Sequence, residues 1–186
     1  MVARAIVSML VCISLAPAAT MAGDTVASSS SVQPSSEGGE SVRECSATTV
    51  RALRFIRVAE ARLKLDDCDR LQWPLEPPLV LELSYHRAVP AHAFDEAARA
   101  MLERNLEEER WRSLQSRVDT FNRGYRDVED GDVYRLHYDR DGSLRLALNG
   151  QTIAREQGHD FARAYLHIWF GEEPYSSRMK ASLLNE

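Results

Sequence analysis

The stretch from residue 130 to residue 171 constrains the fold more than any other part of the chain. Two apolar runs, Val133 to Tyr138 and Ser143 to Leu148, predict two strands. Asn149-Gly150 follows directly and is the strongest two-residue hairpin signal in the chain, so a short third strand is expected after it. An amphipathic run then ends at Gly171, a residue type that commonly ends helices. The stretch therefore predicts an antiparallel meander followed by a helix.

Two further strands are predicted before this stretch. Apolar residues alternate with charged ones from Leu53 to Leu65, which indicates a long strand with one buried face. Leu79 to His86 predicts a second strand. The segment from Pro74 to Pro78 predicts the loop between them.

Helical spacing accounts for most of the remaining sequence. Pro90 opens a region with two apolar stripes, and the charge-dense segment from Asn105 to Arg110 predicts a bend between them. Asp160 is expected to cap the helix described above, and Ser176 or Ser177 is expected to cap a last short helix. The apolar positions that predict core contacts are Phe94, Ala97, Ala98, Met101, Leu102, Leu106, Trp111, Leu114, Val118, Phe121, Phe161, Ala164, Tyr165, Ile168, Trp169, Met179, Leu183 and Leu184. The chain is therefore expected to be an α+β protein, with a mainly antiparallel sheet and helices packed on one face.

The start of the chain is not expected to belong to the folded domain. Residues 1–22 combine a short basic start, an apolar run and small residues before a cleavage site, which is the pattern of a secretory signal peptide. The apolar run is shorter than the ~20 residues that a membrane span requires, and no later stretch is long and apolar enough. Residues 23–43 are rich in Ser and Gly and predict a flexible leader. Residues 44–186 then form one predicted domain, periplasmic or secreted after cleavage.

The charge balance argues against nucleic acid as a partner. The chain has 23 basic and 28 acidic residues and a formal net charge of −5. Binding to nucleic acid requires a basic face that neutralises phosphates. No oligomeric state can be predicted from the sequence.

Export changes how the cysteines are interpreted. Cys12 would leave with the signal peptide, and Cys45 and Cys68 would remain in an oxidising compartment, which favours a disulfide. The bond requires Cα atoms within about 7 Å, so Cys45 would have to fold back along the strand that separates the two residues. A disulfide and two buried free thiols both stay open at this point.

The residues alone predict no active site. The five histidines include no pair with the i, i+4 spacing of a helical zinc site. The turn from Asp139 to Gly142 is similar to a calcium loop but lacks the bidentate glutamate. Neither Cys45 nor Cys68 has a recognisable nucleophile setting, and no glycine loop for phosphate is present. No metal and no cofactor is therefore predicted.

Several short motifs stand in a characteristic order along residues 46–186. They are Arg51-x-x-x-Phe55-x-x-Val58, Tyr85-x-Arg87, Gly131-Asp-x-Tyr134, Leu144-x-Leu-x-Leu-Asn-Gly150, Asp160-Phe-Ala-x-Ala-Tyr165 and Ile168-Trp-Phe-Gly171. Together they resemble the chalcone isomerase-like family, specifically its bacterial exported branch. The resemblance implies an open-faced β-sandwich, in which helices cover one face of a large antiparallel sheet and leave a cleft. In the plant enzymes this cleft cyclises a chalcone to a flavanone, and in non-catalytic relatives it holds fatty acids.

The resemblance also implies where a site would lie. Positions that carry polar catalytic groups in the isomerases align with Ala59, Tyr85, Phe94, Met101 and Ile168. These substitutions remove donors that would stabilise a developing enolate or phenolate, although Tyr85 or Tyr134 can replace a lost hydroxyl. In the fatty-acid-binding relatives an arginine near the first strand meets the ligand carboxylate, and Arg51 matches it. The ligand-binding candidates are Arg51, Tyr85, Phe94 and Tyr134.

Three functions stay open on the sequence. The favoured one is an exported, non-catalytic protein that binds a small lipophilic or carboxylated ligand such as a fatty acid. The second is an intramolecular lyase of chalcone isomerase type with a rearranged site. The third is an envelope interaction protein whose cleft is filled by its own side chains. An open apolar cavity with Arg51 at its mouth would favour the first function, hydroxyl or basic groups pointing into the cavity the second, and a tight core the third.

Overall fold

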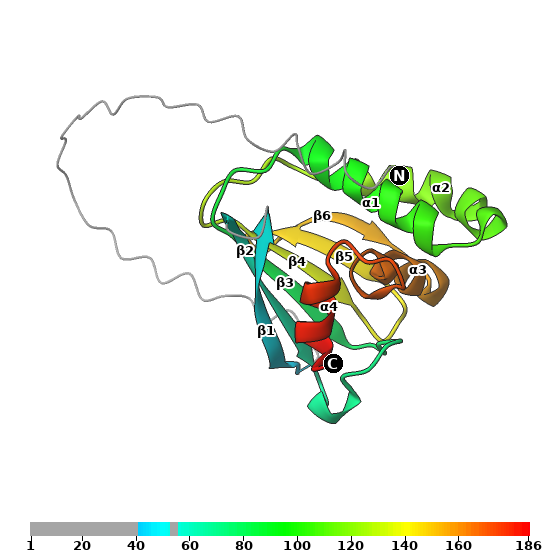
Figure 1. Ribbon diagram of the computed structural model, residues 1–186. Helices are drawn as coiled ribbons and strands as arrows, with labels where there is room; N and C mark the ends of the chain where they lie inside the picture. Colours follow the sequence, from blue (N-terminus) through cyan, green and yellow to red (C-terminus); the bar gives the residue numbers. More distant parts are fainter. Residues whose placement is uncertain (1–40, 53–55) are drawn as a thin grey trace, which may run out of the picture. The chain divides into compact units, whose positions relative to one another are not determined.

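A computed structural model describes residues 41–52 and 56–186 of the chain. The predicted signal peptide, most of the predicted leader, and Leu53 and Phe55 of the predicted first strand lie outside the described residues (Figure 1). Within the described ranges, no helix is long and apolar enough to cross a membrane.

The described part of the chain is built on one six-stranded antiparallel sheet, in which each strand pairs with the next one along the chain. The strands are β1 (Arg43–Ala52), β2 (Ile56–Leu65), β3 (Leu79–Tyr85), β4 (Val133–Tyr138), β5 (Leu144–Leu148) and β6 (Gln151–Glu156). The meander that residues 130–156 predict is confirmed, with the Asn149-Gly150 turn between β5 and β6. Asn149 and Gly150 both have positive φ angles, 50° and 86°, as the tight turn requires.

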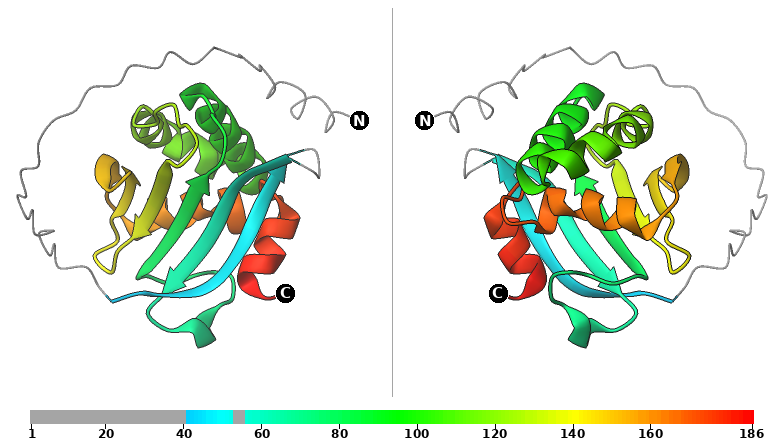
Figure 2. Two further views of the ribbon diagram at one scale, coloured as in Figure 1. Left: turned by 90° about the vertical axis from the view of Figure 1, so that its left-hand side faces the viewer. Right: turned by 90° about the vertical axis from the view of Figure 1, so that its right-hand side faces the viewer.

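The helices pack on one face of this sheet. They are α1 (Ala91–Asn105), α2 (Glu108–Asn122), α3 (His159–Phe170) and α4 (Ser177–Leu184). The right-hand view of Figure 2 shows all four on the same side of the strands. The predicted α+β architecture is therefore confirmed.

The register of the strands aligns the core. Leu63, Leu81, Leu136 and Leu146 are successive cross-strand partners on β2, β3, β4 and β5, and all four are buried. We call this set the leucine row. Because directly opposite residues share one face of a sheet, the row forms the floor on which the helices pack.

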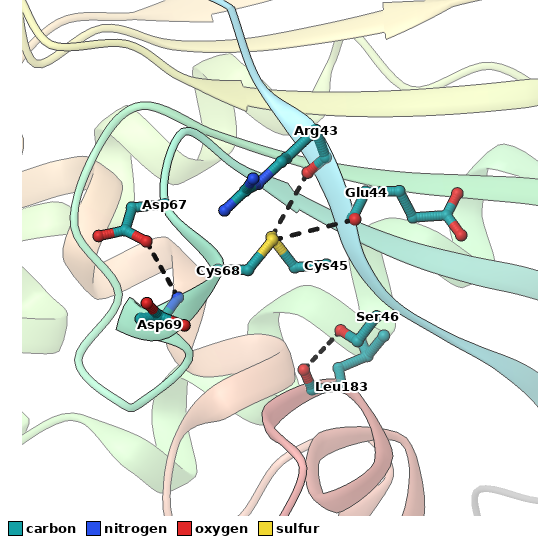
Figure 3. Close-up of a disulfide and its surroundings, with 8 residues drawn as sticks. All are labelled: Arg43, Glu44, Cys45, Ser46, Asp67, Cys68, Asp69 and Leu183. Carbon is teal, nitrogen blue, oxygen red and sulfur yellow. Dashed lines mark hydrogen bonds between the residues drawn. A yellow bond between two sulfur atoms is a disulfide. The ribbon is translucent and has the colours of Figure 1, made fainter.

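The strand β1 was not predicted as a separate element. Its residues Cys45 to Thr49 are small or polar and carry no clear alternation of buried and exposed positions, so no period-two signal was available. The strand is held from both sides instead: it pairs with β2 along its length, and the Ser46 hydroxyl donates a hydrogen bond to the Leu183 carbonyl of α4 at 2.6 Å (Figure 3).

The predicted caps of the last two helices differ in outcome. Ser176 caps α4, since its hydroxyl accepts a hydrogen bond from the Met179 N–H at 3.2 Å. The prediction that Asp160 caps α3 is wrong. Gly158 occupies that position with a φ of 115°, which glycine adopts readily. Asp160 lies in the first turn, where it accepts a hydrogen bond from Arg117 of α2 at 2.9 Å.

Charged side chains cover the opposite face of the sheet. Glu82 lies there but is only 5% exposed, because Arg62, Lys64 and Arg135 surround its carboxylate at 3.4, 2.9 and 2.7 Å. Burial alone would raise the pKa of Glu82, but hydrogen bonds from Lys64 and Arg135 hold that pKa below its ordinary value. The stems of the three cations replace a second layer of helices.

Cys45 and Cys68 form a disulfide (Figure 3). Of the two alternatives, a disulfide or two buried free thiols, the disulfide is confirmed. β1 folds back antiparallel to β2, which brings the Cα atoms to 5.2 Å. The bond connects β1 to the short 3-10 helix η2 (Cys68–Arg70), which follows β2.

Reducing this disulfide should destabilise the fold. The bond closes a loop with a sequence separation of 23 residues, for which the loss of chain entropy predicts about 3 kcal/mol. Urea unfolding of the oxidised and reduced chain would measure the difference. The intact mass should also rise by two hydrogens on reduction. Coincident unfolding curves, or an unchanged mass, would contradict the bond.

Replacement of Glu82 by Gln should cost about 3 kcal/mol at neutral pH, because three partly buried cations lose their shared carboxylate. The matched variant Glu60→Gln removes a carboxylate that also pairs with Arg62 but is 41% exposed, and should cost less than about 1 kcal/mol. Since the folded pKa of Glu82 is lowered from 4.5, its contribution is present above that pH and is lost as the pH falls below it. The difference in the free energy of unfolding between wild type and Glu82→Gln should therefore become smaller in acid. Urea unfolding at several pH values would measure it, and a difference that does not change with pH would count against this role.

Candidate functional site

Four aromatic rings meet between the end of β3 and α1. Tyr85 of β3, Phe94 of α1, Tyr134 of β4 and Tyr125, which follows α2, have centroid separations of 5.2–5.9 Å. Phe94 stacks on Tyr125 and meets Tyr85 and Tyr134 edge-on. We call this set the aromatic cluster. It brings together three of the four predicted ligand-binding residues.

The sheet register positions two of these rings. Tyr85 is the last residue of β3 and opposes Ala59, whereas Tyr134 opposes Leu83 two residues earlier on β3. Residues two apart on one strand share a face, so both rings point to the helix-covered side. Phe94 comes from the first turn of α1, which begins after Pro90 and lies above this end of the strands (Figure 1).

Tyr125 is the member that sequence reasoning missed. It lies in the loop between α2 and β4, outside any periodic pattern. A local signal is Gly124: a Cβ atom there would lie 2.6 Å from the Ala154 Cβ of β6. Only glycine therefore allows this loop to approach the sheet so closely, and the approach directs the next side chain inward.

The hydroxyl protons of the cluster are almost all committed. Tyr134 donates to the Arg126 carbonyl at 2.8 Å. Tyr165 of α3 donates to the Asn122 side-chain oxygen at 2.7 Å, so in its 2.9 Å contact with Tyr125 the proton must come from Tyr125. Among the described residues, the Tyr85 hydroxyl has no hydrogen-bond partner although the residue is only 6% exposed. In the described part of the chain, the fully buried side-chain polar atoms that lack a partner are Asp119 Oδ1 and His167 Nδ1, so the Tyr85 hydroxyl oxygen reaches solvent. Tyr85 therefore holds the one uncommitted donor of the cluster.

These phenols remain protonated well beyond neutral pH. Burial raises the pKa of Tyr85, Tyr125 and Tyr165 strongly, and it raises the pKa of Tyr134 despite the opposing hydrogen bond from Arg126. The neighbouring phenols, including Tyr175, raise the pKa of Tyr85 further. Each hydroxyl can therefore donate a neutral hydrogen bond, and none is poised as a base at neutral pH.

A polar chain leads from the cluster to the surface. Beyond Tyr165, the Asn122 side chain donates to Asp95 at 2.7 Å, and Arg99 bridges Asp95 and Asp119 at 2.9 and 2.6 Å. These groups, except Tyr165, line a surface cavity of about 220 Å³ between α1 and α2 that reaches Tyr125. This series of hydrogen bonds and ion pairs holds the Tyr125 ring in place through its hydroxyl.

A second surface cavity of about 520 Å³ lies at the junction of α1 and α2. Five glutamates line it: Glu103, Glu107, Glu108, Glu172 and Glu173. This surface would repel a carboxylate ligand. Neither cavity is lined by Arg51, Tyr85, Phe94 or Tyr134.

Arg51 is not brought into the cluster. It lies near the end of β1, the edge strand, and is exposed. Its neighbour Val50 is buried and belongs to the cross-strand row with Ala59 and Tyr85, whereas Arg51 opposes the exposed Arg57. The backbone thus passes close to the cluster, while the Arg51 side chain is on the solvent side.

The positions aligned with isomerase groups are parts of the core. Ala59, Met101 and Ile168 are buried and belong to the same apolar core as Tyr85. Within the described ranges, no group of three or more metal-binding side chains is close enough to hold an ion.

Comparison with known proteins identifies the family. A profile of the chalcone isomerase-like family matches residues 70–185, and the chain belongs to this family. The crystal structure of a fatty-acid-binding protein from Arabidopsis thaliana is similar, with a TM-score of 0.55 and 18% sequence identity over 79% of this chain and 88% of that chain. At this identity the likeness shows the fold alone. No curated protein sequence matches the chain.

The raised phenol pKa values predict a late alkaline titration. In the folded protein, phenolate absorbance should be largely absent at pH 10, the ordinary tyrosine pKa, whereas the chain unfolded in guanidinium should be half-titrated there. Because the folded pKa values are raised, the stability that these groups contribute is present below pH 10 and is lost as the pH rises further. Phenolate and unfolding should therefore appear together. Several phenolates in a chain with native circular dichroism at pH 10 would contradict this.

Proposed function

We propose that this protein is exported and non-catalytic, and that it binds a small lipophilic carboxylic acid, such as a fatty acid, at the aromatic cluster. The observation that carries the proposal is the uncommitted hydroxyl of Tyr85 beside the packed rings of Phe94 and Tyr134. A ligand site of this kind combines many apolar contacts with few placed polar groups. The family membership and the similarity to a protein that binds fatty acids support the same class of ligand.

The Tyr85 hydroxyl suits a carboxylate end. A phenol with a raised pKa keeps its proton at neutral pH and can donate it to a carboxylate oxygen, a charge-assisted hydrogen bond. Tyr175, which contributes to the raised pKa of Tyr85, is a half-exposed residue.

Phe94 is the ring that would move to admit the acyl chain. It contacts all three tyrosines of the cluster, so a ligand between them must displace a ring. The hydroxyls of Tyr125 and Tyr134 are held by hydrogen bonds, whereas Phe94 has no polar atom and is only partly buried. If Phe94 keeps its position against every ligand, the cleft is filled by its own side chains and the third function applies.

Arg51 would act at the mouth of the site rather than inside it. Because β1 is an edge strand, a long arginine side chain near its end can extend around the edge towards either face. Among the described residues Arg51 has no ion-pair partner, so its guanidinium is available to attract a carboxylate.

Two observations support export. Residues 1–22 have the pattern of a signal peptide. The Cys45–Cys68 disulfide belongs to the kind of bond that persists in oxidising compartments such as the periplasm.

Titration calorimetry of the purified protein with dodecanoate tests the proposal. Tyr85→Phe should weaken binding by roughly tenfold or more, the usual contribution of a hydrogen bond to a charged group. Tyr134→Phe is the matched control: it removes a hydroxyl from the same cluster whose proton is already committed to Arg126, and its affinity should change by less than about threefold.

The same assay tests the mouth of the site. Arg51→Gln should weaken binding, whereas Arg43→Gln, an exposed arginine at the far end of the same strand, should not. Absence of dodecanoate binding to the wild type, together with purified protein that carries no small molecule in native mass spectrometry, would refute ligand binding. Equal losses in Tyr85→Phe and Tyr134→Phe would refute the role of Tyr85.

A further inference from the structure

Three arginines gather at one end of the sheet. Arg51 near the end of β1 directly opposes Arg57 at the start of β2, and the Arg87 side chain, just after β3, donates a hydrogen bond to the Arg57 carbonyl at 3.2 Å. All three residues are exposed. We call them the arginine row.

The arginine row is unbalanced within the described part of the chain. None of its three members has a carboxylate within ion-pair distance there, whereas Arg62, Arg135 and Arg145 elsewhere on the sheet are all paired. Like charges directly opposite each other on adjacent strands destabilise a sheet. An acidic chain, with a net charge of −5, thus keeps an unpaired basic strip at one end of its sheet.

The strip borders the end of the sheet that holds the aromatic cluster. Arg51 adjoins Val50, which shares a cross-strand row with Ala59 and Tyr85. Arg87 follows Tyr85 by two residues. An acidic group also lies close to His86, the residue before Arg87, since the His86 ring nitrogen lies 3.9 Å from the Asp130 carboxylate. The arginine row therefore lies beside the candidate site.

We propose that the arginine row docks the protein on an anionic phospholipid surface, with this end of the sheet towards the lipid. Guanidinium groups bind phosphate in bidentate fashion, and basic residues near an anionic membrane add favourable energy one by one. The centre of a protein interface is depleted of charged residues, whereas the row consists of three exposed charges. The inference rests on these charges alone and does not need the cluster to hold a ligand.

Sedimentation with lipid vesicles tests this docking. The protein, purified after expression of the full chain, should bind vesicles containing one third phosphatidylglycerol and should bind pure phosphatidylcholine vesicles much more weakly. The double variant Arg57→Gln with Arg87→Gln should lose roughly thirtyfold in partition coefficient. High salt should abolish the binding of the wild type, because exposed charges are screened.

The matched control removes the same charge elsewhere. Arg70 in η2 and Arg104 in α1 are exposed and have no ion-pair partner within the described residues, so the double variant Arg70→Gln with Arg104→Gln should lose less than about threefold. Circular dichroism would verify that both variants are folded. Equal binding to both lipids, or equal losses in both double variants, would overturn the proposal. The dodecanoate assay contains no vesicles and uses protein in which Arg57 and Arg87 are unchanged. Either proposal can therefore fail without the other.

Discussion

The register of the antiparallel meander is the constraint on which the rest of the structure depends. Side chains alternate along each strand, so a shift by one residue would turn the leucine row to solvent and bring Arg62 and Glu82 into the core. The same register turns Tyr85 and Tyr134 to the helix-covered face. The core and the candidate site are therefore products of one alignment, and the charged network around Glu82 stabilises the face that the helices leave uncovered.

The hydrogen bonds of the tyrosine hydroxyls determine which member of the aromatic cluster can donate to a further acceptor. Tyr134 donates its proton to a backbone carbonyl and Tyr125 donates its proton to Tyr165. Tyr85 is then the member of the cluster whose proton has no partner among the described residues. Those bonds also fix the rings of Tyr125 and Tyr134 in place, so the cluster has two rigid walls and one ring without polar anchoring, Phe94. Because burial keeps every phenol protonated, this arrangement suits recognition of an acid better than abstraction of a proton.

Much of the fold could be predicted from the sequence, because β2 to β6 and the helices carry strong periodic or turn signals. The resemblance to the family brought Tyr85, Phe94 and Tyr134 together as candidates, and the structure places them in contact. What escaped prediction lacks a local signal. β1 has small and polar residues and depends on β2 and α4 for its conformation. Tyr125 is positioned by a close loop contact, and the capping role expected for Asp160 passed to a glycine with positive φ.

The central claim is that a carboxylic acid enters the aromatic cluster and bonds to Tyr85. A crystal structure of the protein with dodecanoate tests it most directly. The account predicts a carboxylate oxygen within hydrogen-bond distance of the Tyr85 hydroxyl, a displaced Phe94 ring, and unchanged hydrogen bonds at Tyr125 and Tyr134. An acyl chain bound elsewhere, or one bound in the cluster with its carboxylate away from Tyr85, would contradict it.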